Sequence, residues 1–183
     1  MSKNGLILLT PTTIAYTGTS ATISANGSVT FANCTALSLN GVFSADYDNY
    51  QIVMNFFGGA GSSQQVFYRL RNSGVDATAT DYTWQSLLAN HTSISSVRTT
   101  STNYGYMVVA GVDAWSGCIG NIYGPYLSQP TASRSVNSSS LSTGSVIWDF
   151  ATTHSLSSSY DGISLIPGGD HISGRVAVYG MRK

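Results

Sequence analysis

The sequence predicts an all-β protein, a two-sheet antiparallel β-sandwich of the jelly-roll type with an extended N-terminal arm. The 183-residue chain contains no Glu, and its only Lys residues are Lys3 and Lys183, so two common residues of helix surfaces are nearly missing. Ser, Thr, Gly and Asn supply much of the remainder, and these residues suit turns and exposed strand positions. Runs of β-branched and aromatic residues, separated by turn residues, recur at the spacing of a sandwich.

Residues 1–28 differ from the rest of the chain, and we expect residues 29–183 to form the sandwich domain. The N-terminal segment is either an edge strand of this domain or a docking arm that adds to a neighbouring subunit. Strand addition uses main-chain hydrogen bonds and needs little sequence specificity. The candidate docking residues are the apolar side chains of this segment, namely Leu6, Ile7, Leu8, Leu9 and Ile14.

Residues 51–57 are the clearest strand in the chain, because a β-branched and aromatic run follows a polar corner and ends at Gly58. Ile52, Met54 and Phe56 share one face of this strand. The other face is also largely apolar, so we expect a central strand that is covered on both sides. The last run of the chain, residues 172–181, is its expected partner, and their long-range pairing would close the sandwich.

Further strands are predicted on both sides of this central strand, about eight to ten in all, with the long connections of a jelly roll. Residues 81–88 are ambiguous between a strand and a helical turn, and residues 129–145 form a hydroxyl-rich surface loop or edge. Pro167–Asp170 is a strong turn, which predicts a hairpin between the last two strands. The remaining predicted strands are 37–43, 65–71, 97–101, 104–112, 118–127 (interrupted at Gly124-Pro125), 146–150 and 162–166.

An immunoglobulin-like sandwich is the alternative architecture. Cys34 and Cys118 do not have the sequence spacing of the disulfide in that family, and no Trp lies at the position between them that the family requires. We expect two buried free thiols, with one disulfide as the alternative.

Charge excludes several partners. The net charge is zero and the Arg residues are scattered, whereas nucleic-acid binding needs a cluster of Lys and Arg. The longest apolar run near the N-terminus is far shorter than the roughly 20 residues that span a bilayer, and no signal peptide is visible. We therefore expect no nucleic-acid or membrane partner and synthesis in the cytoplasm.

Catalytic and metal-binding patterns are not found. The three His residues lack metal-ligand spacing, and no GxSxG motif is present. Asp46 to Asn49 is better read as a turn before the central strand, with Tyr50 packed at the corner, than as a calcium loop. A carboxylate pair of Asp113 with Asp149 or Asp161 would suit glycoside hydrolysis, but nothing else supports it. We expect no enzyme activity, no metal and no cofactor.

Aromatic side chains are the one feature with binding potential, because aromatic rings stack on sugars and also anchor protein interfaces. We favour a place in an interface or the core over a sugar site. The candidates lie in or near loops or at strand ends, and they are Trp84, Tyr104, Tyr106, Trp115, Tyr123 and Tyr126.

Residues 29–182 resemble a family of small structural proteins of tailed bacteriophages, especially phages of cyanobacteria. The resemblance is carried by VTFANCTALSLNGVFSADYDNYQIVMNF, by the YRLR and NIYGPY runs, and by the ending DGISLIPGGDHISGRVAVYGMR. It implies a virion component, either a tail-fibre or appendage domain or a capsid-decorating (cement) protein.

On this resemblance the expected function is non-enzymatic and structural, on the surface of the virion. The expected partners are the chain itself, as a homotrimer, and other capsid or tail proteins. The alternative is a host-receptor or carbohydrate-binding module at a fibre tip, whose partner would be a host surface glycan.

Overall fold

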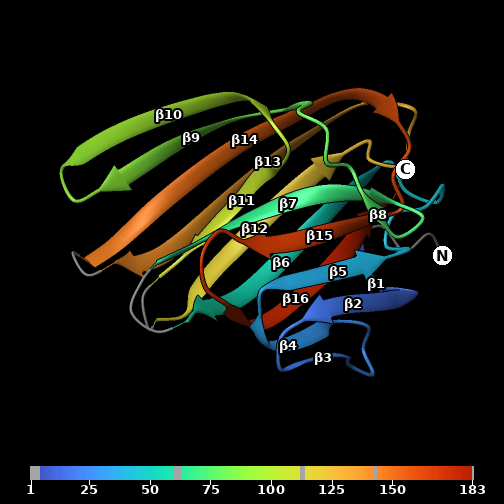
Figure 1. Cartoon of the computed structure of the whole chain (residues 1–183), viewed down its shortest axis with the longest axis horizontal. Helices are drawn as coiled ribbons and strands as arrows, with labels where there is room; N and C mark the ends of the chain where they lie inside the picture. The colour runs from blue at the N-terminus through green and yellow to red at the C-terminus, as the bar shows by residue number, and fades with distance from the viewer. Residues whose placement is uncertain (1–4, 60–62, 112–113, 142–143, 183) are drawn as a thin grey trace.

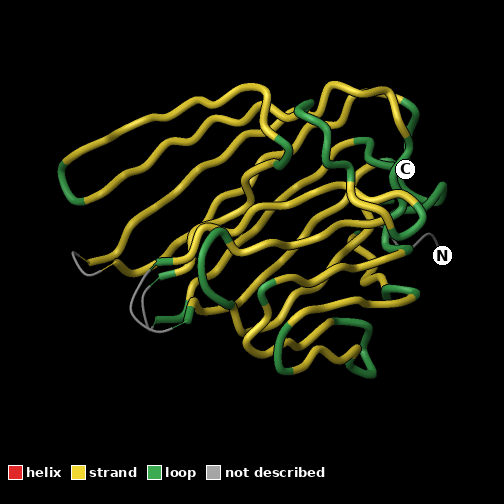
Figure 2. The backbone as a smooth tube through the Cα atoms, in the orientation of Figure 1, coloured by secondary structure: helices red, strands yellow, loops and turns green. Residues whose placement is uncertain are grey.

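The computed structural model describes residues 5–59, 63–111, 114–141 and 144–182. Over these residues the chain forms β-strands joined by turns and loops and contains no helix, so none of them lies in a helix that could span a membrane (Figure 2). The strands make two antiparallel sheets that pack face to face, which confirms the predicted β-sandwich of the jelly-roll type (Figure 1).

The large sheet has the strand order β10-β9-β14-β13-β12-β6-β16-β4-β3, and β1 pairs with β16 beside this path. Its strands are β1 (Leu6–Leu9), β3 (Ser20–Ile23), β4 (Val29–Cys34), β6 (Asn49–Gly58), β9 (Tyr82–Asn90), β10 (Ser93–Thr102), β12 (Ser116–Tyr123), β13 (Gln129–Leu141), β14 (Gly144–Ser158) and β16 (Ile172–Met181).

The small sheet has the order β11-β7-β15-β5-β2, and β8 pairs with β7. Its strands are β2 (Thr13–Thr17), β5 (Ala36–Asn40), β7 (Gln64–Asn72), β8 (Val75–Asp76), β11 (Gly105–Ala110) and β15 (Gly162–Pro167).

The predicted pairing of the central strand with the chain's last strand is confirmed. β6 pairs with β16 along its whole length, from Asn49 opposite Met181 to Gly58 opposite Ile172. The inner side chains of β6 are buried in the main core, but Asn55 on its outer face is exposed. The expectation that both faces are covered is therefore wrong, because the small sheet packs on one face only and no described element packs on the other.

The polar corner before β6 folds as the sequence predicts. Tyr50 is fully buried, and its hydroxyl donates to the carbonyl of Ser44 at 2.8 Å and accepts from the Ser44 amide at 2.7 Å. Phe43 packs against its ring with centroids 4.6 Å apart. Burial raises the pKa of the Tyr50 hydroxyl. The aromatic ring thus fixes the angle at which the chain enters the central strand.

The turn at Pro167–Asp170 is present, but it does not form the predicted hairpin. β15 pairs with β5 and β7 in the small sheet, whereas β16 pairs with β6, β4 and β1 in the large sheet. The amide of Gly168 donates to the carbonyl of Gln65 at 2.7 Å. Turn residues specify a reversal of the chain but not the neighbour of each strand, and here the reversal carries the chain from one sheet to the other.

The N-terminal segment is extended, and its described residues pair within the sandwich. β1 pairs with β16, β2 with β5, and β3 with β4. Leu9 and Ile14 pack against the main core. Of the two interpretations given for residues 1–28, edge strands describe residues 6–23. A docking role for these edges stays a prediction.

The segment expected to be a surface loop or edge, residues 129–145, is instead mostly β13, which pairs with β12 on one side and β14 on the other. Residues 81–88 fall in strand β9, which settles their ambiguity. The sequence obscured β13 because its inward side chains are polar although they are buried. They are Thr131, Ser133, Ser135, Asn137 and Ser139.

Two of these inward polar residues, Ser135 and Asn137, satisfy the edge of the small sheet. β11 pairs with β7 on one side only, so its other side would leave backbone groups unpaired in the interior. Asn137 donates to the carbonyl of Val109 at 3.0 Å and accepts from the Val109 amide at 3.4 Å. Ser135 donates to the carbonyl of Met107 at 2.5 Å, so side chains of β13 replace a neighbouring strand.

Replacing Asn137 by Ala should therefore lower the free energy of unfolding by about 2–3 kcal/mol, because it leaves the N–H and the C=O of Val109 buried without these hydrogen bonds. Urea titration monitored by Trp fluorescence measures this change. The matched control is Ser138→Ala on the outer face of β13, for which we expect about 0.5 kcal/mol or less. Equal losses in the two variants would contradict this role of Asn137.

Candidate functional site

Three of the predicted aromatic residues meet under the β9–β14 part of the large sheet. The ring of Tyr106 stacks on Phe150 with centroids 4.3 Å apart and meets Trp84 edge-on at 4.9 Å. Tyr104 lies against Phe67 at 4.0 Å. Trp84 and Tyr106 are 9 % and 5 % exposed, and burial raises the pKa of Tyr106. This group is a second hydrophobic cluster beside the main core, as the core interpretation of these residues predicts.

The other three predicted aromatics do not join this cluster. Trp115 is 60 % exposed and meets Phe57 edge-on at 5.0 Å. Tyr123 is exposed at the far end of β12, and Tyr126 packs against the main core. Trp115 and Tyr123 therefore flank opposite ends of one strand and cannot form a single stacking surface.

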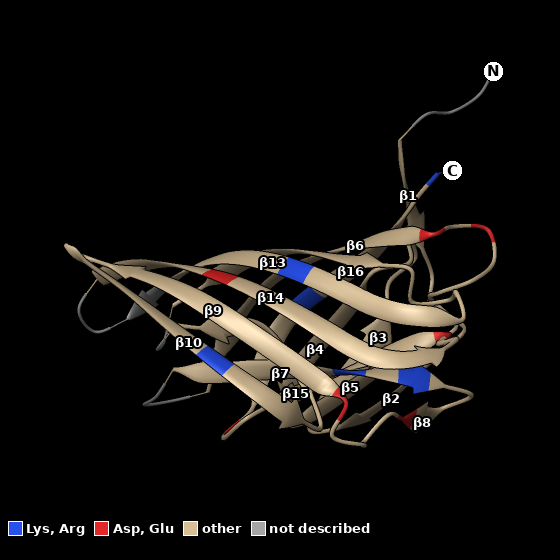
Figure 3. Ribbon diagram, turned by 90° about the horizontal axis from the view of Figure 1, so that it is seen from above, with Lys and Arg blue, Asp and Glu red and all other residues tan. Residues whose placement is uncertain are grey.

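The outer face of the large sheet carries the open surface of the molecule. Register places Val53, Ile119 and Val136 side by side across β6, β12 and β13. Ile119 and Val136 are 53 % and 43 % exposed. Charged residues are scattered along the strands rather than gathered in one place (Figure 3). An apolar, nearly uncharged strip thus crosses the centre of this face.

An apolar hollow of about 600 Å³ lies in this strip. Gly117 belongs to its floor, and a Cβ atom there would meet only the hydroxyl of Ser138, at 4.0 Å. The absent side chain therefore leaves space at the surface. The apolar side chains around it are Val53, Ile119, Val136 and Ile147.

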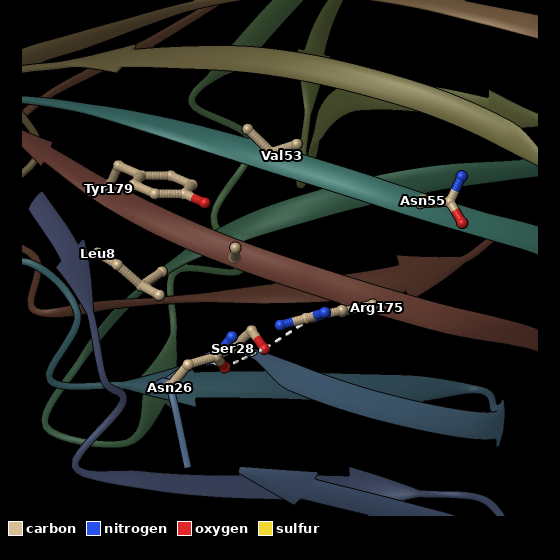
Figure 4. A pocket seen from close by; sticks show the side chains of 8 residues that line it. Leu8, Asn26, Ser28, Val53, Asn55, Arg175 and Tyr179 are labelled. Atoms are coloured by element: carbon tan, nitrogen blue, oxygen red, sulfur yellow. Dashed lines mark hydrogen bonds between the residues drawn. The ribbon is translucent and has the colours of Figure 1, made fainter. Parts of the chain in front are cut away.

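A second hollow of about 270 Å³, which we call the polar hollow, adjoins the first and shares Val53 and Asn55 with it. Arg175, Ala177 and Tyr179 alternate along β16, so their side chains lie on the same outer face. Figure 4 shows the ring of Tyr179 and the side chain of Leu8 on one side of the hollow, with Arg175 reaching toward the β4 side. The lining residues are Leu8, Asn26, Ser28, Val53, Asn55, Arg175, Ala177 and Tyr179.

A short relay of hydrogen bonds orients Arg175. Its Nε donates to the hydroxyl of Ser28 at 2.8 Å, and that hydroxyl donates to Oδ1 of Asn26, also at 2.8 Å (Figure 4). Ser28 is only 1 % exposed, so the anchor itself is buried. The Asn26–Ser28 turn precedes β4, which pairs with β16 beside Arg175. The fold therefore builds the polar hollow from the turn before β4 and from the outer faces of β1, β6 and β16.

The sequence predicted only one member of this site, Leu8, and predicted it for another role. Leu8 reaches the hollow because β1 pairs with β16 opposite Tyr179. Arg175 and Tyr179 were missed because they belong to a strand recognised by its apolar residues. Their alternation on one face, with Ala between them, is the signal that could have found them.

Other titratable groups do not converge. His154 is buried beside Tyr82, and burial lowers the pKa of its imidazole. Asp149 pairs with Arg134, and Asp161 accepts from the amide of Ser73. Asp113 lies outside the described residues. Cys34 and Cys118 are buried and free, and no cluster of three or more His, Cys, Asp or Glu residues occurs over the described ranges.

Together these observations define a jelly-roll β-sandwich whose large sheet has an open outer face with two adjoining hollows. No family model and no curated protein matches the sequence. Among solved structures, the chain is similar to the CBM2 module of the evolved Dit of Lactobacillus casei BL23 phage J-1, with 11 % identity over 95 % of this chain and 92 % of that one and a TM-score of 0.30. It is also similar to lectin II from Ulex europaeus, with 10 % identity over 93 % of this chain and 95 % of that one and a TM-score of 0.26. TM-scores this low transfer no function.

Proposed function

We propose that this protein is a glycan-binding module displayed on a phage particle, and that the polar hollow is its binding site. The observation that carries the proposal is the combination of side chains in that hollow. Tyr179 offers an aromatic surface for stacking. Asn26, Asn55 and Arg175 offer amide and guanidinium groups that hydrogen-bond to hydroxyls.

The form of the site also suits a sugar. The hollow is small and open, and Arg175 is held in place before any ligand arrives, which lowers the entropy that binding must offset. Apart from Asn26 and Ser28 in the turn before β4, its lining residues lie on strands of the large sheet, so their side chains keep a fixed spacing. Placement on the particle rests on the sequence resemblance to phage structural proteins.

Replacing Tyr179 by Ala should weaken glycan binding about tenfold, because a stacking ring contributes on the order of 1.4 kcal/mol. A glycan array that includes host lipopolysaccharide identifies the ligand, and calorimetric titration then measures its Kd. Tyr179→Phe keeps the ring and should keep most of the affinity.

The matched control is Tyr123→Ala, which removes an exposed ring two strands away on the same outer face, outside the lining of the polar hollow, and should leave binding unchanged. The thermal unfolding midpoint of each variant shows whether the fold is intact. If Tyr123→Ala or Trp115→Ala abolishes binding while Tyr179→Ala does not, the polar hollow is not the site.

A second candidate function is a structural one, in which the chain decorates a capsid or builds a tail appendage as a homotrimer. The exposed apolar strip of Val53, Ile119, Val136 and Ile147 favours it, because a contiguous apolar patch marks protein contacts. The purified protein separates the two candidates. A glycan-binding module binds its sugar without the particle, whereas a purely structural subunit binds only to itself or to other virion proteins.

A further inference from the structure

The polar hollow also indicates which sugars it takes. We infer that its ligand is an anionic glycan, and that a carboxylate or phosphate oxyanion of the ligand pairs with the guanidinium of Arg175. This inference rests on the proposed function, since it names the class of glycan for the same site.

The geometry of Arg175 favours an anionic ligand. Its Nε is engaged by Ser28, whereas its two terminal nitrogens have no partner within the described part of the chain. A guanidinium is planar, so one fixed hydrogen bond at Nε also restrains the plane in which the terminal N–H groups lie. Two such groups match the two oxygens of a carboxylate or phosphate.

Arg175 also lacks a counter-charge in the polar hollow. The lining of the polar hollow contains no acidic side chain. Two other arginines show the contrast, because Arg71 pairs with Asp76 and Arg134 pairs with Asp149. Arg134 lies on the same outer face, yet both of its bonds go to that carboxylate, at 3.0 and 2.5 Å. Arg175 therefore keeps a positive charge that its own neighbours do not neutralise.

The guanidinium of Arg175 and the ring of Tyr179 are well separated in the hollow. Arg175 and Tyr179 are four residues apart on one strand, about 13 Å at the usual rise per residue. Ala177 lies between them and leaves the floor shallow. This spacing favours an oligosaccharide, with one sugar stacked on Tyr179 and the anionic group of another at Arg175.

The test compares charged and neutral forms of one ligand. Calorimetric titrations are run with a galacturonic acid oligosaccharide, with its fully methyl-esterified form and with glucose 6-phosphate. The acid should bind at least tenfold more tightly than the ester, and raising the salt concentration should reduce this difference. The titration with glucose 6-phosphate shows whether a sugar phosphate binds as tightly as a uronic acid.

Arg175→Gln should remove the preference for the acid, because it lowers the affinity for the acid at least tenfold more than the affinity for the ester, and Arg175→Lys should restore part of the preference. Arg98→Gln is the matched control, because it removes an exposed charge from the far end of the same face. An equal loss in Arg98→Gln would indicate general charge attraction and would overturn the inference.

The two levels of the proposal fail differently. Equal binding of the acid and the ester, unchanged in Arg175→Gln, overturns the anionic ligand and leaves glycan binding intact. Failure of the protein to bind any sugar of a broad glycan array overturns the proposed function itself.

Discussion

Gly174→Ala is expected to lower the free energy of unfolding by on the order of 4 kcal/mol. Gly174 has a φ of +155°, which a side chain rarely adopts. A Cβ atom there would lie 2.3 Å from the carbonyl oxygen of Asn55 and 2.6 Å from Cα of Phe56. Both atoms belong to the backbone of β6, so no flexible side chain can move aside. The clash falls in the pairing of β6 with β16, on which the whole large sheet is built.

Equilibrium unfolding in guanidinium chloride measures this loss. The matched control is Gly117→Ala on β12, where a Cβ atom would meet only the Ser138 hydroxyl at 4.0 Å, so we expect little change. A Gly174→Ala protein as stable as the Gly117→Ala protein would contradict the close approach of the two strands.

The same variant connects the fold to the site. Gly174 lies where the pairing of β16 with β4 shifts register, one residue before Arg175. This register shift involves β4, the strand that directly follows Ser28. The hydroxyl of Ser28 accepts from Nε of Arg175 and so anchors its side chain. We therefore regard the glycine as part of the reason that the guanidinium is held at the polar hollow.

The sequence predicted the parts of the fold that depend on apolar patterning. β6, β7 and β16 carry inward apolar residues at every second position, and the pairing of β6 with β16 follows from two long apolar runs. Tyr50 and its corner were also predictable, since turn chemistry and a buried ring act locally.

The errors have physical reasons as well. β13 was mistaken for a surface loop or edge because Ser135 and Asn137 are polar although they are buried, and their hydrogen bonds to β11 appear only in the tertiary structure. The turn at Pro167–Asp170 was correctly placed, but its flanking strands enter different sheets, since β15 pairs with β7 and β16 pairs with β6.

The candidate site was harder to predict than the fold. Residue type alone selected Trp84 and Tyr106, and burial then assigned them to the core. The polar hollow depends on a long-range contact between Ser28 and Arg175, which are 147 residues apart in the sequence. The polar hollow is assembled from four separate segments, so each segment shows only a weak alternation of polar and apolar residues.

Arg71→Ala is the second substitution expected to have a large effect, with a loss of about 3–5 kcal/mol in the free energy of unfolding. Arg71 is buried on the outer side of β7, where its side chain is 10 % exposed. It pairs with Asp76 and donates to the carbonyl of Gly74, to Ser164 at 2.6 Å and to Ser38 at 3.0 Å.

The loss follows from what remains after truncation rather than from the strength of the ion pair. Without the guanidinium, the half-buried carboxylate of Asp76 keeps only the hydroxyl of Ser164, at 2.7 Å, as a hydrogen-bond partner within the described part of the chain, and a buried charge without a counter-ion is costly. The double variant Arg71→Met with Asp76→Asn should therefore be more stable than Arg71→Ala, because it removes both charges and fills most of the volume. Arg69→Ala, two residues earlier on the same face, loses one hydrogen bond from Nε to the carbonyl of Asn103 and should cost about 1 kcal/mol. Denaturant titration of the four proteins, wild type included, measures the free energy of unfolding of each. An Arg71→Ala protein no less stable than the Arg69→Ala protein would refute the role of the buried pair in holding β7, β8 and β15 together.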